Sequence, residues 1–292
     1  MKKLIAAILG AVMILGGFSG IALAYEEGDA RVTIGADLTA EQKAQIYADF
    51  GLTQGEVPEI IVTNANERAY LEGIAPEGKI GSVALSCVYI TILEDGKGLD
   101  ITTKNINWCT SELYTNALVT AGITDAKVMV SAPFPVSGTA ALTGIYKAYE
   151  DITGETLSEL AKTVGVEEPI TTGDLAEYIG SEEASQIVNE LKKILDQTQT
   201  MTDDEVRSEI RRIASDYNVV ISDAQVEQLL KLCRSLEKLD VDELRQKLIN
   251  LAETVNKAKS AQETLTKIGE SIKNFFASVG AFFTRLFGGN KG

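Results

Sequence analysis

The apolar positions in the first 165 residues follow two periods, one typical of strands and one typical of helices. Strand-like runs lie at residues 31–35, 59–63, 82–93, 99–103 and 127–131. The run 82–93 is apolar on both faces, which is typical of a central strand that is covered on both sides. The Asp- and Gly-rich segment 94–98 predicts a hairpin turn after it. Because helix-like segments alternate with these strands, we predict an N-terminal α+β or α/β domain, residues 25–165, with a mixed sheet.

The start and stop signals are densest between residues 105 and 150. The pattern predicts a helix over 111–121 that ends at Gly122, because glycine suits the left-handed position after a helix. A strand at 127–131 then runs into the turn 133–139, and a helix with apolar residues at threes and fours leaves that turn. We therefore expect the first domain to be organised around this turn.

Two polar turns are candidate binding sites. Ser137, Gly138 and Thr139 lie where a strand gives way to a helix N-terminus, whose free N–H groups and positive dipole favour anions. The alternative is an ordinary capped turn, because one glycine without a following lysine is far weaker than a phosphate loop. The second turn gathers amide and charged side chains at 64–68. It is either a capped, solvated turn or the rim of a ligand site.

Helix-breaking residues punctuate the chain after the first domain. They are Gly165, Pro169, Gly173 and Gly180. We predict a linker there, residues 166–180, and an all-α helical region, residues 181–260, after it. Two helices of this region begin with capping boxes, at 202–205 and at 222–225.

Residues 1–24 have the form of a secretory signal peptide. Two lysines precede an apolar stretch, and Ala22-Leu23-Ala24 has the small-x-small form of a cleavage site. The alternative is an uncleaved membrane anchor, because the apolar stretch is long enough to span a bilayer. We expect cleavage after Ala24 and a secreted or extracytoplasmic location.

Residues 261–292 predict an amphipathic C-terminal helix. Its apolar stripe contains five of the eight phenylalanines of the chain: Phe275, Phe276, Phe282, Phe283 and Phe287. The segment is locally basic in an acidic protein, so the stripe suits contact with an anionic membrane surface or with an envelope protein. The alternative is a last helix that folds back onto the helical bundle.

Composition excludes several classes of function. The net charge is -15 at pH 7, so we expect no nucleic-acid partner, because phosphate binding needs a basic face. The chain has no histidine, which excludes a Ser-His-Asp triad, a His-ligated zinc and a His-based pH switch within it. We identify no catalytic residue, no metal site and no cofactor motif.

The three cysteines leave two alternatives open. Cys87 and Cys109 flank the predicted hairpin, which would bring their segments together for a disulfide, whereas Cys233 lies in the helical region. The alternative is three buried free thiols, because an odd number suits no complete disulfide framework.

Four segments of the chain resemble a known family. They are Ile80–Ser86, Asn105–Trp108, Tyr114–Ile123 and Ala132–Gly144. In these segments the chain is similar to the secreted, YpuA-like family described as domain of unknown function 1002, and the similarity covers about residues 30–260. The resemblance implies export from Gram-positive-type bacteria. It implies no reaction and no catalytic residues.

We therefore expect an exported cell-envelope protein that acts as a binding or structural module. One alternative is an enzyme that uses carboxylates on an envelope polymer, and another is a regulatory partner of a membrane protein. A pocket that holds two carboxylates with raised pKa values favours the enzyme. We favour a function without catalysis.

Overall fold

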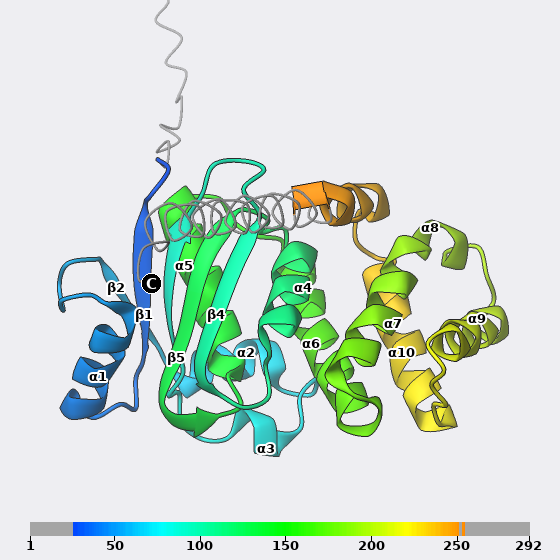
Figure 1. Ribbon diagram of the computed structural model, residues 1–292, viewed down its shortest axis with the longest axis horizontal. Coiled ribbons are helices and arrows are strands. Elements are labelled where there is room, and N and C mark those ends of the chain that lie inside the picture. Colours follow the sequence, from blue (N-terminus) through cyan, green and yellow to red (C-terminus); the bar gives the residue numbers. More distant parts are fainter. Residues whose placement is uncertain (1–25, 251–252, 255–292) are drawn as a thin grey trace, which may run out of the picture.

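The computed structural model describes residues 26–250 and 253–254. Its sheet has five strands: β1 (Ala30–Gly35), β2 (Glu59–Val62), β3 (Cys87–Ile92), β4 (Leu99–Ile106) and β5 (Ala126–Val136). The strand order is β2-β1-β3-β5-β4 (Figure 1). β1 pairs with β2 and β4 pairs with β5 in parallel, whereas β3 is antiparallel to both of its neighbours. The predicted α+β fold with a mixed sheet, followed by helices, is confirmed.

The hairpin predicted at 94–98 is wrong, because β5 lies between β3 and β4. The physical reason is the burial of the two strands. Five residues of β5 are buried, whereas no residue of β4 is, and Thr102, Thr103 and Lys104 are exposed. A strand with an apolar surface gains more from a central position, and a polar strand tolerates the edge.

Helices cover both faces of the sheet (Figure 1). On one face, α1 (Ala40–Phe50) packs Ile46 and Phe50 against Val32 and Ile34 of β1. On the other face, α4 (Ser111–Ala121) and α5 (Thr139–Thr153) bury the larger apolar cluster against β3 and β5. Two shorter helices, α2 (Asn64–Leu71) and α3 (Glu77–Ile80), also belong to this half. The predicted helix over 111–121 is confirmed, and Gly122 has the left-handed conformation expected after it.

The predicted linker at 166–180 is wrong, because α6 (Glu159–Ile179) runs through it as one helix of 21 residues. The glycines that indicated a linker are positions of close packing. A Cβ on Gly165 would lie 2.9 Å from the carbonyl oxygen of Ala117, and one on Gly173 would lie 2.7 Å from the Trp108 ring. Glycine therefore lets α6 approach its neighbours closely, at some cost in helix propensity.

The second half is helical, as predicted. Its helices include α7 (Ser181–Lys193), α8 (Leu195–Thr198), α9 (Asp203–Asp216) and α10 (Asp223–Leu236). Residues 241–250 are helical as well. Both predicted capping boxes are present, at the starts of α9 and α10. These helices bury a second apolar cluster against the outer side of α6, to which α6 contributes Val164 and Leu175, whereas Val166 and Ile170 face the first cluster. The two halves therefore share α6 (Figure 1).

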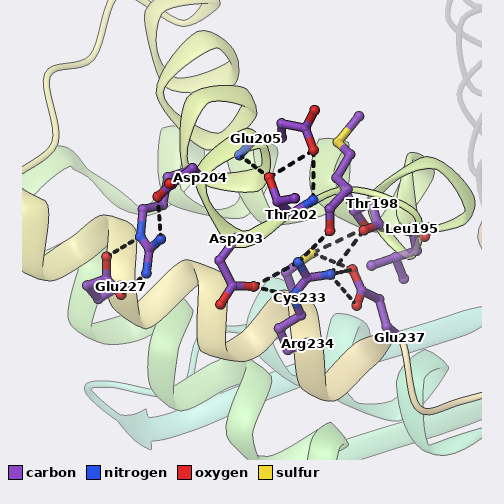
Figure 2. Close-up of polar contacts among 12 residues, drawn as sticks. Leu195, Thr198, Thr202, Asp203, Asp204, Glu205, Glu227, Cys233, Arg234 and Glu237 are labelled. Carbon is purple, nitrogen blue, oxygen red and sulfur yellow. Dashed lines mark hydrogen bonds and ion pairs between the residues drawn. The ribbon is translucent and has the colours of Figure 1, made fainter.

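Arg234 holds the ends of three helices of the second half together (Figure 2). Its Nη1 donates to the carbonyl oxygen of Thr198, which ends α8, at 3.0 Å. Its Nη2 donates to the carbonyl oxygen of Met201 at 2.9 Å and to Asp203, at the start of α9, at 2.8 Å. Glu237, after α10, accepts from Nη1 at 2.8 Å. The planar guanidinium makes all these bonds at once, which a lysine could not do.

A buried ion pair joins the two halves. Lys192 of α7 donates to Glu168 of α6 at 2.8 Å, and both side chains are completely buried. The hydroxyl of Thr120, on α4, donates to the other carboxylate oxygen of Glu168. Three helices therefore meet at one carboxylate. Removing one partner of such a pair leaves an uncompensated charge in the interior.

We expect Lys192→Met to lower the free energy of unfolding by roughly 3–5 kcal/mol, because Glu168 would remain buried without a cation. The matched control is Lys193→Met, because Lys193 is exposed and pairs only with its helix neighbour Glu190. The control should cost no more than about 1 kcal/mol. Urea unfolding measures both values, and equal losses in the two variants would contradict the assigned role of Lys192.

Candidate functional site

A pocket of about 230 Å³ lies beside the turn between β5 and α5. Residues from α2, from the segment 78–86 and from the turn line it. Its polar and charged lining residues are Glu67, Lys79, Ser86, Ser137 and Thr139, and the Lys79 ammonium pairs with Glu177 on α6. The structure therefore brings Ser137, Gly138 and Thr139 to one pocket together with the second polar turn, 64–68.

The local sequence explains why Glu67 points inward. Thr63 and Asn66 form a capping box that begins α2. Leu71 follows Glu67 by four residues, so the two side chains share one face of α2, and both are buried. Glu67 is only 1% exposed. The helix that buries Leu71 therefore buries a carboxylate as well.

Hydroxyl groups link Glu67 to the turn. The Thr139 hydroxyl donates to Glu67 Oε1 at 2.6 Å and also lies 3.0 Å from the carbonyl oxygen of Lys79. The Ser137 hydroxyl donates to the same carbonyl oxygen at 2.8 Å. Asn64 Nδ2 donates to Glu67 Oε2 at 3.4 Å. Arg68, the next residue along α2, forms its ion pair with Glu77 instead.

Burial raises the pKa of Glu67 to about 7, although the hydrogen bonds from Thr139 and Asn64 and the charge of Arg68 act in the opposite direction. The hydrogen-bond geometry suits both protonation states. An ionised Glu67 accepts from Thr139, whereas a protonated Glu67 can donate to Thr139, which then donates to the carbonyl oxygen of Lys79. A carboxyl group that titrates near neutral pH in a pocket is a candidate functional group.

Glu67 should make stability depend on pH. Its folded-state pKa of about 7 lies above the ordinary value of 4.5, so the native state binds more protons between these values. Its contribution is complete below pH 4.5 and is lost as the pH rises through about 7. We expect Glu67→Gln, which keeps the shape of the side chain, to be more stable than the wild type by up to about 3 kcal/mol at pH 8.

Urea unfolding of both proteins between about pH 5 and pH 8 measures this difference. The control is Glu77→Gln, because Glu77 is exposed and the hydrogen bond from Arg68 lowers its pKa. Glu77→Gln should therefore slightly lower the free energy of unfolding at high pH, whereas Glu67→Gln should raise it. A difference between Glu67→Gln and the wild type that does not change with pH would contradict the inferred pKa.

The turn at Ser137–Thr139 contacts a carboxylate of the same chain, that of Glu67, and not an external anion. Gly138 precedes α5 with a φ of 93°, and no side chain caps the helix. The Tyr114 hydroxyl donates to the carbonyl oxygen of Gly138 at 2.6 Å, and this hydrogen bond holds the turn against α4. At the start of α5, the Thr139 hydroxyl donates its hydrogen bond to Glu67. Binding of an external anion by Ser137–Thr139 stays a prediction, and an ionised Glu67 would repel such an anion.

All three cysteines are free and buried, so the disulfide considered between Cys87 and Cys109 is not formed. Cys87 packs with α1 on one face of the sheet, whereas Cys109 packs in the cluster on the opposite face. The hairpin that would have brought the two segments together does not exist, because β5 separates β3 from β4. Burial raises the pKa of each of these two thiols to about 12.

Two predictions fall on residues outside the described part of the chain. They are the signal peptide, residues 1–24, and the C-terminal helix, residues 261–292, with Phe275, Phe276, Phe282, Phe283 and Phe287. Both stay predictions. In the part of the chain that the structure describes, no helix combines the length and the apolarity needed to cross a membrane.

A second cleft, of about 780 Å³, lies between the end of α6 and the start of α10. Asp174 and Glu177 both line it and lie three residues apart on α6, which makes them neighbours on the helix surface. Partial burial and the charge of Glu177 raise the pKa of Asp174, whereas the hydrogen bond from Lys79 lowers the pKa of Glu177. The cleft thus holds two carboxyl groups whose pKa values are shifted in opposite directions.

The sequence indicated both polar turns that line the Glu67 pocket, but it did not indicate that the two turns contact each other. The turn 64–68 and the turn 133–139 were each candidate sites, and 72 residues separate Glu67 from Thr139. The carbonyl oxygen of Lys79, which accepts from both hydroxyls, gives no signal in a sequence. Among the described residues, no three Cys, Asp or Glu side chains are grouped so that they could hold a metal ion.

The fold and the pocket define an α+β protein with a helical extension and a buried carboxylate beside its central turn. The family model described as "Protein of unknown function (DUF1002)" matches residues 34–257, and the chain belongs to this family. It is 36% identical over 291 residues to the "Uncharacterized protein YpuA" of Bacillus subtilis (strain 168), covering 98% of this chain and 97% of that protein. No solved structure gives a significant match. The resemblance inferred from the sequence is confirmed.

Proposed function

We propose that this protein is an exported binding module of the cell envelope, and that the Glu67 pocket takes an ammonium group of its ligand. The observation that carries the proposal is the Glu67 carboxyl group, which has a pKa of about 7, is 1% exposed and lies in the wall of a pocket. It forms no salt bridge with any residue that the structure describes. Buried charges are normally paired. A bound cation would supply the missing partner.

The pocket has acceptors for an ammonium group and a surface for an alkyl chain. The acceptors are the Glu67 carboxylate, the carbonyl oxygen of Lys79 and the Ser137 hydroxyl oxygen. Val83, which is exposed, and Leu85 form apolar wall. A ligand that combines a primary amine with an aliphatic stem matches both parts, as a lysine-like side chain does.

Binding should depend on pH through Glu67. An ammonium ion stabilises the ionised carboxylate, so only the ionised fraction of the protein is competent to bind. Given a pKa of about 7, we expect n-butylammonium to bind roughly 100-fold more weakly near pH 5 than near pH 8. Titration followed by NMR chemical shifts at several pH values measures this ratio.

The controls separate the charge from the shape of the ligand. The neutral isostere n-butanol should show no pH dependence, and Glu67→Gln should abolish the pH dependence for n-butylammonium. Glu77→Gln should change nothing, because Glu77 already pairs with Arg68 outside the pocket lining. The same affinity for n-butylammonium at all pH values, or no binding at millimolar concentrations, would overturn the proposed ligand chemistry.

An enzyme that acts on an envelope polymer is the alternative function, and one observation favours it. Asp174 and Glu177 line one cleft with pKa values shifted apart, which is the arrangement of a general acid beside an ionised carboxylate. Release of soluble fragments from purified cell-wall polymer by the wild type, but not by Asp174→Asn, would replace the binding proposal with the enzymatic one.

Export is the second part of the proposal, and the sequence of residues 1–24 supports it. We expect the mature protein recovered from the envelope or the medium to begin at Tyr25. N-terminal sequencing of that protein tests the expectation, and a sequence that begins at Met1 would contradict it. Attachment through the C-terminal phenylalanine stripe, to an anionic membrane or to an envelope protein, is part of the same proposal.

A further inference from the structure

A third pocket, of about 370 Å³, lies between β4, α4 and α7. Its lining comes from three elements that are far apart in the sequence. The residues are Leu99, Asp100 and Ile101 of β4, Ser111, Glu112, Thr115 and Asn116 of α4, and Ser185 and Asn189 of α7. It shares no residue with the Glu67 pocket or with the cleft beside α10.

Two buried amide atoms of residues that line this pocket have no hydrogen-bond partner among the described residues. One is Nδ2 of Asn116, a side chain that is only 7% exposed. The other is the Oδ1 atom of Asn189, which is also buried. Buried polar groups in folded proteins nearly always have partners, and each one without a partner calls for an explanation. The donor of Asn116 and the acceptor of Asn189 do not bond to each other. Both atoms are buried, so a ligand in the pocket reaches them only when the two side chains rotate toward it.

A donor and an acceptor in one pocket match the two sides of a secondary amide. The carbonyl oxygen of a ligand amide can accept from Asn116, and its N–H can donate to Asn189. A ligand that makes both bonds satisfies two unsatisfied buried atoms at once. The pocket therefore favours ligands that contain a peptide-like amide.

The edge strand of the sheet forms one wall of this pocket. β4 is the last strand of the sheet order, and among the described strands it pairs with β5 alone. Alternate residues of an edge strand leave their N–H and C=O groups unpaired on the outer side. The pocket is lined by three consecutive residues of β4, at 99–101, and consecutive residues of a strand point to opposite faces. The ligand space therefore follows the edge of the strand.

The negative charge of this pocket favours peptides with basic side chains. Asp100 and Glu112 contribute two carboxylates, and no lysine or arginine lines the pocket. Both acidic side chains are exposed, so they can pair with basic side chains of a ligand without a large desolvation cost. Complementary charges at the rim of a site mainly raise the association rate and fix the register.

We propose that an extended, basic peptide segment of a partner protein adds to the edge of β4 and places one of its amide groups between Asn116 and Asn189. Main-chain hydrogen bonds to β4 supply affinity, as in other cases of strand addition. The two asparagines and the two carboxylates supply selectivity for the peptide and its register.

The test uses the mature full chain and the blocked peptide acetyl-Thr-Lys-Val-Lys-Thr-amide, which has high strand propensity and two basic side chains. We expect chemical-shift changes in two-dimensional ¹H–¹⁵N spectra at the backbone of β4 and at the side-chain amides of Asn116 and Asn189. Asn116→Ala and Asn189→Ala should each weaken binding by about tenfold. Both variants should remain folded, because each removes a side chain with one buried atom that has no partner among the described residues.

Three comparisons decide the outcome. The same peptide with N-methylated central amides should bind at least tenfold more weakly, because it cannot donate to β4 or to Asn189. Asn250→Ala, a change at an exposed asparagine outside the pocket, should leave the affinity unchanged. The proposal is overturned if the N-methylated peptide binds equally well, if N-acetylglucosamine shifts both asparagine signals while the peptide shifts neither, or if the peptide does not bind at millimolar concentration.

Discussion

The ion pair between Lys192 and Glu168 is the constraint on which the joining of the two halves depends. Both side chains are completely buried, so each charge needs the other to offset the free energy of leaving water. Thr120 completes the arrangement by donating to Glu168. Because these three residues come from α7, α6 and α4, helices from the sheet domain and from the helical region cannot shift past one another without breaking the pair.

The position of α6 also affects the two candidate sites, because α6 contacts them through Trp108 and Lys79. The Trp108 ring packs against Gly173 of α6, and the ammonium of Lys79 lies 4.8 Å from the centre of that ring. Lys79 also donates to Glu177 of α6 at 2.8 Å. The carbonyl oxygen of Lys79 is the acceptor shared by the two hydroxyls in the Glu67 pocket. Through Lys79, α6 is therefore connected both to the cleft that it lines and to the Glu67 pocket.

The sequence predicted what depends on neighbouring residues and missed what depends on distant ones. Caps, helix ends and the central strands followed from local chemistry, as at Gly122. Insertion of β5 between β3 and β4 did not, because it is decided by a comparison of burial between strands. Gly165 and Gly173 were taken for breaks because a sequence does not show whether a glycine ends a helix or lets another element approach it. Glu67 was recognised as polar, but its burial and its partner Thr139 required the fold.

Two buried carboxylates of the chain, Glu168 and Glu67, have different partners. Glu168 receives a lysine and a hydroxyl and is fully paired. Glu67 receives hydroxyl and amide donors but no cation from the described residues, although Arg68 is its neighbour on α2 and pairs with Glu77. A protein that needed Glu67 only for packing would be more stable with an apolar or amide side chain there. This difference from Glu168 is the physical argument for the proposed cationic ligand at Glu67.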